Sequence, residues 1–166
     1  MTIGLLLAGG KSMRFLSGDK ALFADWLETA YNKLSELTDE VWVSVSASNR
    51  EAIKKRLPEA NILSDEAPYV GEGPLSAFYA LSVKFDGRLD VLSLPVDSPE
   101  IVLSDLTDLL TTPNVFVREN FLIAHVTFSS DELSDFLASG ERRVKKFFSG
   151  LGAEIVDVEV VNHNEK

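Results

Sequence analysis

The sequence contains no cysteine among its 166 residues. This absence excludes disulfide scaffolds, thiol catalysis and cysteine metal clusters. No apolar run approaches the ~20 residues that a membrane-spanning helix needs. The first apolar segment, residues 3–8, follows no basic residues and ends at Gly9 and Gly10, so it makes a poor signal peptide. We therefore expect a cytoplasmic protein that does not contact a membrane.

Basic residues are few compared with acidic ones. The 16 Lys and Arg residues stand against 26 Asp and Glu residues, which gives a formal net charge of −10. So acidic a chain does not bind nucleic acid through a broad basic face. It can bind a small anion where basic groups are focused locally and a divalent cation screens the remaining charge. The sequence has two histidines, and neither a Ser/His/Asp set nor zinc-ligand spacing is present, which disfavours hydrolase and zinc chemistry.

Composition and periodicity indicate an ordinary globular α/β protein. Hydrophobic residues make up 45% and charged residues 25% of the chain, and at roughly 150 residues per domain we expect residues 1–166 to form one domain. Short apolar runs predict strands over residues 3–8, 41–45, 62–63, 89–94, 114–117, 121–128 and 153–161. Helical spacing, capping residues or a leading proline predict helices over residues 22–37, 48–57, 74–85, 103–110, 133–138 and 142–148.

The order of these elements predicts the fold class. Strands that alternate with helices form parallel pairs with right-handed crossovers. The two apolar runs within residues 114–128 predict a hairpin, and hence one antiparallel strand pair in an otherwise parallel sheet. We therefore expect a three-layer α/β/α architecture with a mixed, mostly parallel sheet. Ligands of such sheets bind beyond the carboxyl ends of the strands.

The loop after the first predicted strand, residues 9–20, carries the most information. Its Lys11, Arg14 and Lys20 against Asp19 give a local charge of +2. Its three glycines let the backbone approach a ligand and point N–H groups at it. The loop is a plausible site for nucleotide phosphates, although a Gly-Gly pair after a strand is more often only a tight turn. It matches neither G-x-x-x-x-G-K-[ST] nor G-x-G-x-x-G.

Asp97 is the second candidate. It follows the strand predicted at residues 89–94 and lies between Pro95 and Pro99. A hard carboxylate held there suits Mg²⁺, which binds one or two protein oxygens together with substrate phosphates. The alternative is a helix N-cap or a turn residue.

Other candidates follow later strands. Gly73 and Pro74 predict a sharp entry to a helix whose N-terminus faces an anion or a base, or an ordinary helix start. Asp65 follows the third predicted strand and either binds ribose or base, or caps a turn. Near the end of the sequence, the oxygens of Asn162 and Asn164 can complete a cation shell or bind phosphate, unless this end is frayed.

Two further positions carry side chains suited to chemistry. The guanidinium fork of Arg142 or Arg143 suits an anionic second substrate, against the alternative of a solvated helix face. His125 lies within an apolar predicted strand, where a structural role is the better interpretation.

Several segments together resemble a known family. The string LAGG-x-x-x-R-x-x-x-x-D-K at residues 7–20 resembles the signature loop of the nucleotidyltransferases with a GT-A-like, Rossmann-like fold. Four further segments resemble, in order, those of the molybdenum cofactor guanylyltransferase family: Gly73-Pro74-Leu75, Pro95-Val96-Asp97-Ser98-Pro99, Gly140-Glu141-Arg142-Arg143 and Asn162-His163-Asn164. The first loop is specific for the superfamily, and the set in order points to the molybdenum-cofactor branch.

The resemblance implies a reaction and a set of site residues. Molybdopterin would attack GTP with the help of Mg²⁺, giving molybdopterin guanine dinucleotide and pyrophosphate. Lys20 and Arg14 would bind the triphosphate, Lys20 would stabilise charge at the α-phosphoryl group, and Asp97 would bind Mg²⁺. The nucleotide would also contact Leu7, Ala8, Gly9, Gly10, Ser46, Asp65, Gly73, Pro74 and Leu75. The acceptor or its phosphate would contact Arg142, Arg143, Asn162 and Asn164.

Two alternatives stay open at this point. In the first, the chain is a nucleotidyltransferase that uses CTP or a sugar phosphate. In the second, it is a family member that binds nucleotide or pterin without catalysis. The family also implies transient contact with proteins that handle molybdenum cofactor.

Overall fold

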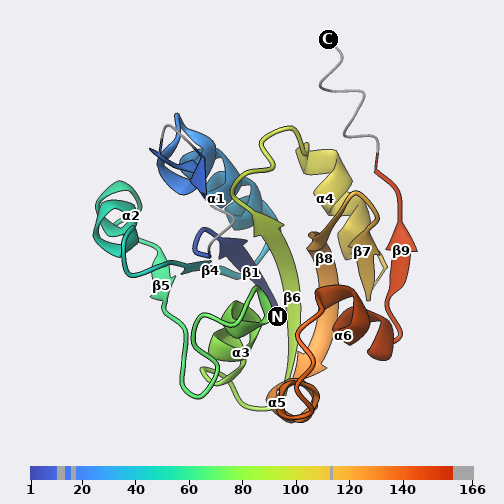
Figure 1. Ribbon diagram of the computed structural model, residues 1–166. Coiled ribbons are helices and arrows are strands. Elements are labelled where there is room, and N and C mark those ends of the chain that lie inside the picture. Colours follow the sequence, from blue (N-terminus) through green and yellow to red (C-terminus); the bar gives the residue numbers. More distant parts are fainter. Residues whose placement is uncertain (11–13, 16–17, 113, 159–166) are drawn as a thin grey trace.

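A seven-stranded mixed sheet forms the centre of the computed structural model, which describes residues 1–10, 14–15, 18–112 and 114–158. Its spatial order is β5-β4-β1-β6-β8-β7-β9 (Figure 1). The strands are β1 (Thr2–Leu7), β4 (Glu40–Ser44), β5 (Asn61–Leu63), β6 (Arg88–Pro95), β7 (Val115–Val117), β8 (Asn120–Ser129) and β9 (Glu154–Val156). A separate two-stranded sheet, β2 (Arg14–Phe15) with β3 (Gly18–Asp19), lies in the first loop.

The pairing of the strands confirms the predicted mixed sheet. β1 is parallel to β4 and β6, and β4 is parallel to β5. β8 is antiparallel to both β6 and β7, and β9 is parallel to β7. The carboxyl ends of β5, β4, β1 and β6 therefore meet at one edge of the sheet.

Helices cover both faces of the sheet, which confirms three layers (Figure 1). One core contains side chains from α1 (Trp26–Leu37), α2 (Arg50–Arg56) and α4 (Leu103–Leu110). The other contains side chains from α3 (Leu75–Ser82), α5 (Ser130–Ala138) and α6 (Val144–Gly150). β1 contributes Leu6 to the first core and Leu5 and Leu7 to the second, because successive side chains of a strand point to opposite faces.

Several predicted boundaries are wrong. The helix expected from residue 22 begins at Trp26, after a separate 3₁₀ turn η2 (Lys20–Leu22). Ala24 lies between them with φ of +46°, a conformation that a helix cannot continue through. The strand expected at residues 153–161 ends at Val156, and residues 159–161 lie outside the described part of the chain.

The S-x-x-E patterns from Ser48 to Glu51 and from Ser129 to Glu132 predict two capping boxes, and the second is present. At α5, the Ser129 hydroxyl accepts from the Glu132 N–H, and Glu132 accepts from the Ser129 N–H. The expected pair of Ser48 and Glu51 is wrong, because Asn49 is the N-cap of α2 and its side chain is engaged elsewhere.

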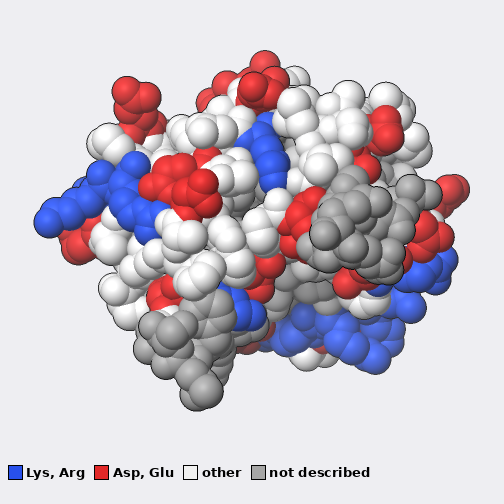
Figure 2. Space-filling model, turned by 90° about the horizontal axis from the view of Figure 1, so that it is seen from above, with Lys and Arg blue, Asp and Glu red and all other residues white. Residues whose placement is uncertain are grey.

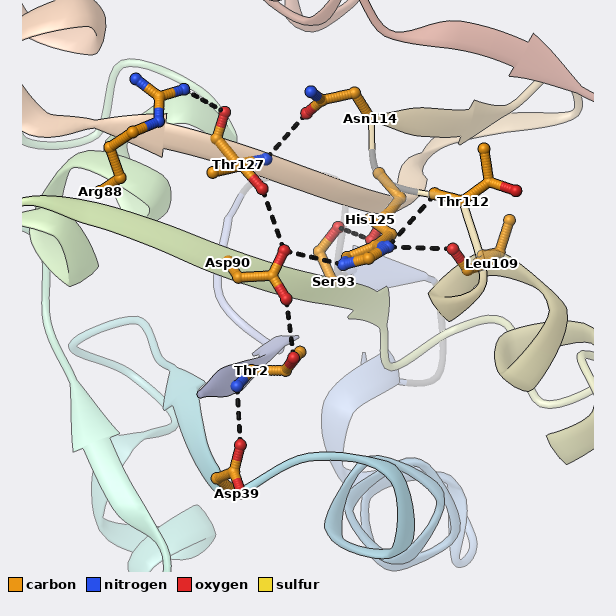
Figure 3. A network of polar contacts seen from close by, with 11 residues as sticks. Thr2, Asp39, Arg88, Asp90, Ser93, Leu109, Thr112, Asn114, His125 and Thr127 are labelled. Atoms are coloured by element: carbon orange, nitrogen blue, oxygen red, sulfur yellow. Dashed lines mark hydrogen bonds and ion pairs between the residues drawn. The ribbon is translucent and has the colours of Figure 1, made fainter.

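His125 has a structural role, as its place in an apolar strand suggested. It is 4% exposed, and its Nε2 lies 2.8 Å from Asp90 Oδ1 while Nδ1 lies 2.9 Å from the Leu109 carbonyl oxygen. Figure 3 shows Asp90 between His125, Thr127 and Thr2, whose hydroxyls also donate to this carboxylate. The network joins β1, β6 and β8 through half-buried polar contacts.

The environment of Asp90 favours its ionised form. Burial acts to raise the pKa of this carboxyl group, but the hydrogen bonds from Thr2 and Thr127 and the interaction with His125 outweigh burial, so that the pKa lies below its ordinary value. A group with a lowered folded-state pKa stabilises the fold above its unfolded-state pKa, and this contribution is lost as the pH falls through the folded-state pKa.

We predict that Asp90→Asn lowers the free energy of unfolding at about pH 7 by ~1–3 kcal/mol, the usual effect of removing a charged hydrogen-bond partner. The difference from the parent protein should begin to shrink near about pH 4, where an aspartate of the unfolded chain protonates, and should be lost as the pH falls through the lower pKa of folded Asp90. Urea unfolding at both pH values measures it, with exposed Asp86→Asn as the control. A difference independent of pH would contradict this account of Asp90.

Candidate active site

The loops after the parallel strands are tied together by backbone hydrogen bonds. The N–H of Ala8 donates to the Ser44 carbonyl oxygen at 2.9 Å, and the N–H of Val96 donates to the Leu7 carbonyl oxygen at 3.0 Å. The N–H of Val45 donates to the Leu63 carbonyl oxygen at 2.9 Å. These bonds continue the sheet one residue past the strands, so the loops of β1, β4, β5 and β6 begin side by side.

The glycine pair after β1 is required by its surroundings. A Cβ on Gly9 would lie 2.8 Å from the Val45 carbonyl carbon and 3.0 Å from the Ser46 nitrogen, both of which are backbone atoms. Gly10 has φ of +100°, which side chains rarely adopt. Leu7 and Ala8 are buried, whereas Gly10 is exposed. The turn therefore offers solvent its backbone rather than side chains.

Lys20 and Asp97 are brought together, although 77 residues separate them in the sequence. Lys20 Nζ lies 3.3 Å from Asp97 Oδ2, and the two side chains are 28% and 22% exposed. Lys20 begins η2 at the end of the first loop, while Asp97 follows β6. A cation and a carboxylate thus meet at the carboxyl edge of the sheet.

Lys33 supports the turn that carries Asp97, a role that no sequence pattern indicated. From α1, its amine donates to the carbonyl oxygens of Pro99 at 3.2 Å and Ile101 at 2.6 Å. Burial lowers the pKa of this amine, against the opposing effect of the Glu100 carboxylate. α1 therefore fixes the backbone just after Asp97.

Asn49 is a second residue that sequence analysis missed. Its side chain is buried and contacts Ala8, Asp19 and Ser46, which come from three different segments at this edge. The signal in the sequence was an Asn shortly after a strand, at the start of a helix, where a side chain can reach neighbouring loops. Ser46, a predicted nucleotide contact, donates its N–H to Asn49 Oδ1 at 2.9 Å.

Asp65 and the Gly73 segment belong to one loop. Asp65 Oδ2 accepts from the Gly71 N–H at 2.8 Å, so this side chain closes the turn after β5. Pro74 is the N-cap of α3, and Leu75 is buried beneath it. The loop thus leads from the shared edge of the sheet directly into α3.

Arg142 is held against that same loop. Its Nε and one terminal nitrogen donate to Glu72 Oε1 at 2.8 and 2.5 Å, and its guanidinium carbon lies 5.3 Å from the centre of the Tyr69 ring. The other terminal nitrogen donates to the carbonyl oxygens of Leu137 and Glu141. The structure therefore joins Arg142 to the loop of Asp65 and Gly73, and its described contacts do not include the pair of Lys20 and Asp97.

Arg143 has a different environment at the surface. It donates to both oxygens of Glu141 at 3.0 and 2.7 Å. The hydrogen bonds from the Arg143 side chain, followed by those from the backbone of Arg142 and Arg143, hold the pKa of Glu141 well below its usual range. In return, Glu141 raises the pKa of Arg143.

Three predicted residues lack a described side chain. The backbone of Arg14 pairs with Asp19 in the small sheet of the first loop, one residue before Lys20. Asn162 and Asn164 lie outside the described residues.

The charge distribution agrees with a local rather than a broad cationic site. On the face shown in Figure 2, basic side chains occur in separate groups with acidic side chains between them. Among the described residues, no three His, Asp or Glu side chains gather as a ready metal cage. The described part of the chain also has no helix with the length and apolarity needed to cross a membrane.

Comparison with known proteins assigns this arrangement to a family. The sequence matches the profile described as the MobA-like NTP transferase domain over residues 4–156. The chain belongs to this family. The protein is therefore a nucleotidyltransferase. No curated protein matches the sequence significantly.

Solved structures share the fold at low sequence identity. Molybdopterin-guanine dinucleotide biosynthesis protein A from Archaeoglobus fulgidus is 17% identical with a TM-score of 0.65, over 98% of this chain and 86% of that one. A nucleotidyl transferase from Methanothermobacter is 15% identical with a TM-score of 0.66, over 93% and 87%. The 4-diphosphocytidyl-2C-methyl-D-erythritol synthase of Anaerococcus prevotii is 13% identical with a TM-score of 0.63, over 99% and 94%. These likenesses confirm the predicted GT-A-like fold.

We predict that Gly9→Ala disturbs the edge of the sheet, because the added methyl group meets backbone atoms of Val45 and Ser46 that cannot rotate away. The free energy of unfolding should fall by ~1–3 kcal/mol, as for other overpacked sites. Gly150→Ala is the matched control, since its Cβ would meet nothing within 4 Å. Thermal unfolding of both variants measures the difference, and equal midpoints would contradict the tight contact at Gly9.

Proposed function

We propose that the protein transfers GMP from GTP to molybdopterin in a Mg²⁺-dependent reaction that releases pyrophosphate. The observation that carries the proposal is the contact of 3.3 Å between Lys20 Nζ and Asp97 Oδ2 beside the Gly9 turn. Membership of the NTP transferase family and the ordered segments of the molybdenum-cofactor branch support it. We place this activity in a single domain in the cytoplasm, in transient contact with proteins that handle the cofactor.

The chemistry asks for positioned charge more than for a proton relay. Transfer of a phosphoryl-type group spreads negative charge over the phosphate oxygens, so catalysis consists of in-line positioning and charge neutralisation. In the proposed reaction the Lys20 amine turns from Asp97 toward the α-phosphoryl group, with Arg14 on the triphosphate. Lys20 is suited to this role because it is partly exposed and, among the described residues, its amine contacts the Asp97 carboxylate alone.

The donor set at Asp97 fits a magnesium ion. Asp97 Oδ2 meets Lys20, and Oδ1 has no hydrogen-bond partner within the described residues. Mg²⁺ commonly uses one or two protein carboxylates and completes its shell with water and substrate phosphates. When bound, the ion would neutralise phosphate charge during transfer. Asp97 would hold it, and the proline-flanked turn fastened by Lys33 would keep that carboxylate in place.

The remaining residues divide between the two substrates. In this proposal the nucleotide contacts Leu7, Ala8, Gly9, Gly10, Ser46, Asp65, Gly73, Pro74 and Leu75. The acceptor and its phosphate contact Arg142, Arg143, Asn162 and Asn164. An anionic acceptor at Arg142 competes with Glu72, and at Arg143 it competes with Glu141.

A cytidylyl transfer is the second candidate. The fold is as similar to the 4-diphosphocytidyl-2C-methyl-D-erythritol synthase of Anaerococcus prevotii as to the guanine dinucleotide protein, with TM-scores of 0.63 and 0.65. The choice of base therefore rests on the ordered sequence segments rather than on the fold.

We predict that GTP with Mg²⁺ raises the thermal midpoint more than CTP, ATP or UTP does. At about 100 times its dissociation constant, a ligand adds ~2.7 kcal/mol to the free energy of unfolding. For a protein of this size the rise is roughly 5–10 °C. A rise with CTP in place of GTP would replace guanylyl by cytidylyl transfer. No rise with any nucleotide would favour a member without catalysis, or an ordered reaction in which the pterin binds first.

We predict that Lys20→Ala and Asp97→Asn each lower kcat for pyrophosphate release from GTP and molybdopterin by at least about a hundredfold. Loss of one preorganised charge contact to a transition state has this size. Lys54→Ala, an exposed lysine of α2, is the matched control and should keep the parent rate. A Lys20→Ala enzyme that turns over at the parent rate would remove Lys20 from the mechanism.

A further inference from the structure

We propose that Asn49 is a positioning residue of the active site, because one buried amide holds both the glycine turn and the segment that carries Lys20. Its consequence for catalysis rests on the proposed function. Asn49 is 1% exposed and lies at the N-cap of α2, where its side chain contacts Ala8 after β1 and Ser46 after β4.

Both N–H donors of the Asn49 amide and its oxygen make hydrogen bonds. Its Nδ2 donates to the Ala8 carbonyl oxygen at 2.9 Å and to Asp19 Oδ2 at 3.0 Å. Its Oδ1 accepts from the Ser46 N–H at 2.9 Å. The contacts require two donors and one acceptor in a fixed plane, which an amide supplies and a carboxylate does not.

The contact with Asp19 leads to Lys20. The other oxygen of Asp19, Oδ1, accepts from the Ala21 N–H at 2.8 Å and so caps η2, the short turn that begins with Lys20. Asp19 is therefore held on one side by Asn49 and on the other by the turn itself. Without the hydrogen bond from Asn49, Asp19 at the start of η2 is no longer held from outside the turn. The Lys20 amine then loses its fixed position opposite Asp97.

The contact with Ala8 leads to the nucleotide turn. The next residue, Gly9, lies so close to the loop after β4 that an added Cβ would come within 3.0 Å of backbone atoms of Val45 and Ser46. Asn49 bridges the same two segments by bonding Ala8 on one side and Ser46 on the other. One side chain thus links the glycine turn to the loop after β4 and to the segment that carries Lys20.

Exchanging the amide of Asn49 and the carboxylate of Asp19 separates two roles of Asn49. One role is to hold the segment of Lys20, and the other is to hold the glycine turn through Ala8. Asp19→Asn removes one bond that places Lys20 but leaves the Ala8 contact, because an amide at 19 cannot accept from both Ala21 and Asn49 while keeping its orientation. Asn49→Asp removes both donor contacts. In the double variant the amide at 19 donates to the carboxylate at 49 and still caps η2, whereas the Ala8 oxygen stays without its donor.

We expect a split between kcat and nucleotide affinity. Asp19→Asn should lower kcat for pyrophosphate release about tenfold with an unchanged dissociation constant for Mg·GTP. Asn49→Asp should lower kcat about tenfold or more and weaken Mg·GTP about tenfold. The double variant should recover kcat to within about threefold of the parent, while its affinity for Mg·GTP stays weak.

A matched control removes the same chemical group elsewhere. Asn61 also donates its amide to a backbone carbonyl oxygen, that of Val41 at 3.2 Å, but it lies at the first residue of β5, away from the carboxyl edge. Asn61→Asp should therefore leave both constants unchanged. A purely structural role of Asn49 would lower the thermal midpoint without the split and without recovery in the double variant.

Crystal structures of the same variants test the inference without any assay. We expect Lys20 Nζ to leave Asp97 in Asp19→Asn and Asn49→Asp and to return in the double variant. An unmoved Lys20 in both single variants would overturn the inference. If the parent protein transfers no nucleotide but Lys20 moves as expected, the proposed function fails while the positioning role of Asn49 stands.

Discussion

The register of the parallel strands at their carboxyl ends is the constraint on which the site depends. The bonds from Ala8 to Ser44 and from Val96 to Leu7 continue that register into the loops, so two segments far apart in sequence begin as neighbours. The side chains of Lys20 and Asp97, which these loops carry, can then contact each other. Because backbone bonds set the spacing, the residues within the loops are free to carry chemistry rather than to build the edge.

Buried and half-buried polar side chains have different roles at two places in the structure. Asp90 and His125 join β1, β6 and β8 through contacts that include none of the candidate site residues, so their contribution is to stability (Figure 3). Asn49 joins loops that carry candidate site residues, so its contribution is to geometry. In both places the buried polar atoms have hydrogen-bond partners, and within the described residues no buried side-chain nitrogen or oxygen lacks one. A polar group that is fully bonded in the interior fixes one arrangement of its neighbours.

The sequence predicted those features that follow from chain-wide periodicity. Alternation of strands and helices, and the rule that ligands bind beyond strand ends, placed the segments of Lys20 and Asp97 at one edge. Periodicity does not predict which single side chains bond to the backbone of another segment, which is why Asn49 and Lys33 were missed. The start of α1 was misplaced for a related reason: the break at Ala24 lies in one backbone angle, while the apolar spacing runs straight through it. The assignment of Ser48 as a cap failed because Asn49 took that position.

The pairing of charges explains how so acidic a chain is suited to a triphosphate. Three basic groups proposed to contact the substrates already face a carboxylate: Lys20 faces Asp97, Arg142 faces Glu72, and Arg143 faces Glu141. A phosphate that takes over one of these cations leaves a carboxylate uncompensated in a protein of net charge −10. For Asp97 that cost would fall away if a divalent cation arrived with the nucleotide, because Asp97 would hold the ion and the ion would neutralise phosphate charge. The dependence on Mg²⁺ in the proposed reaction thus follows from the same contact that holds Lys20 in place.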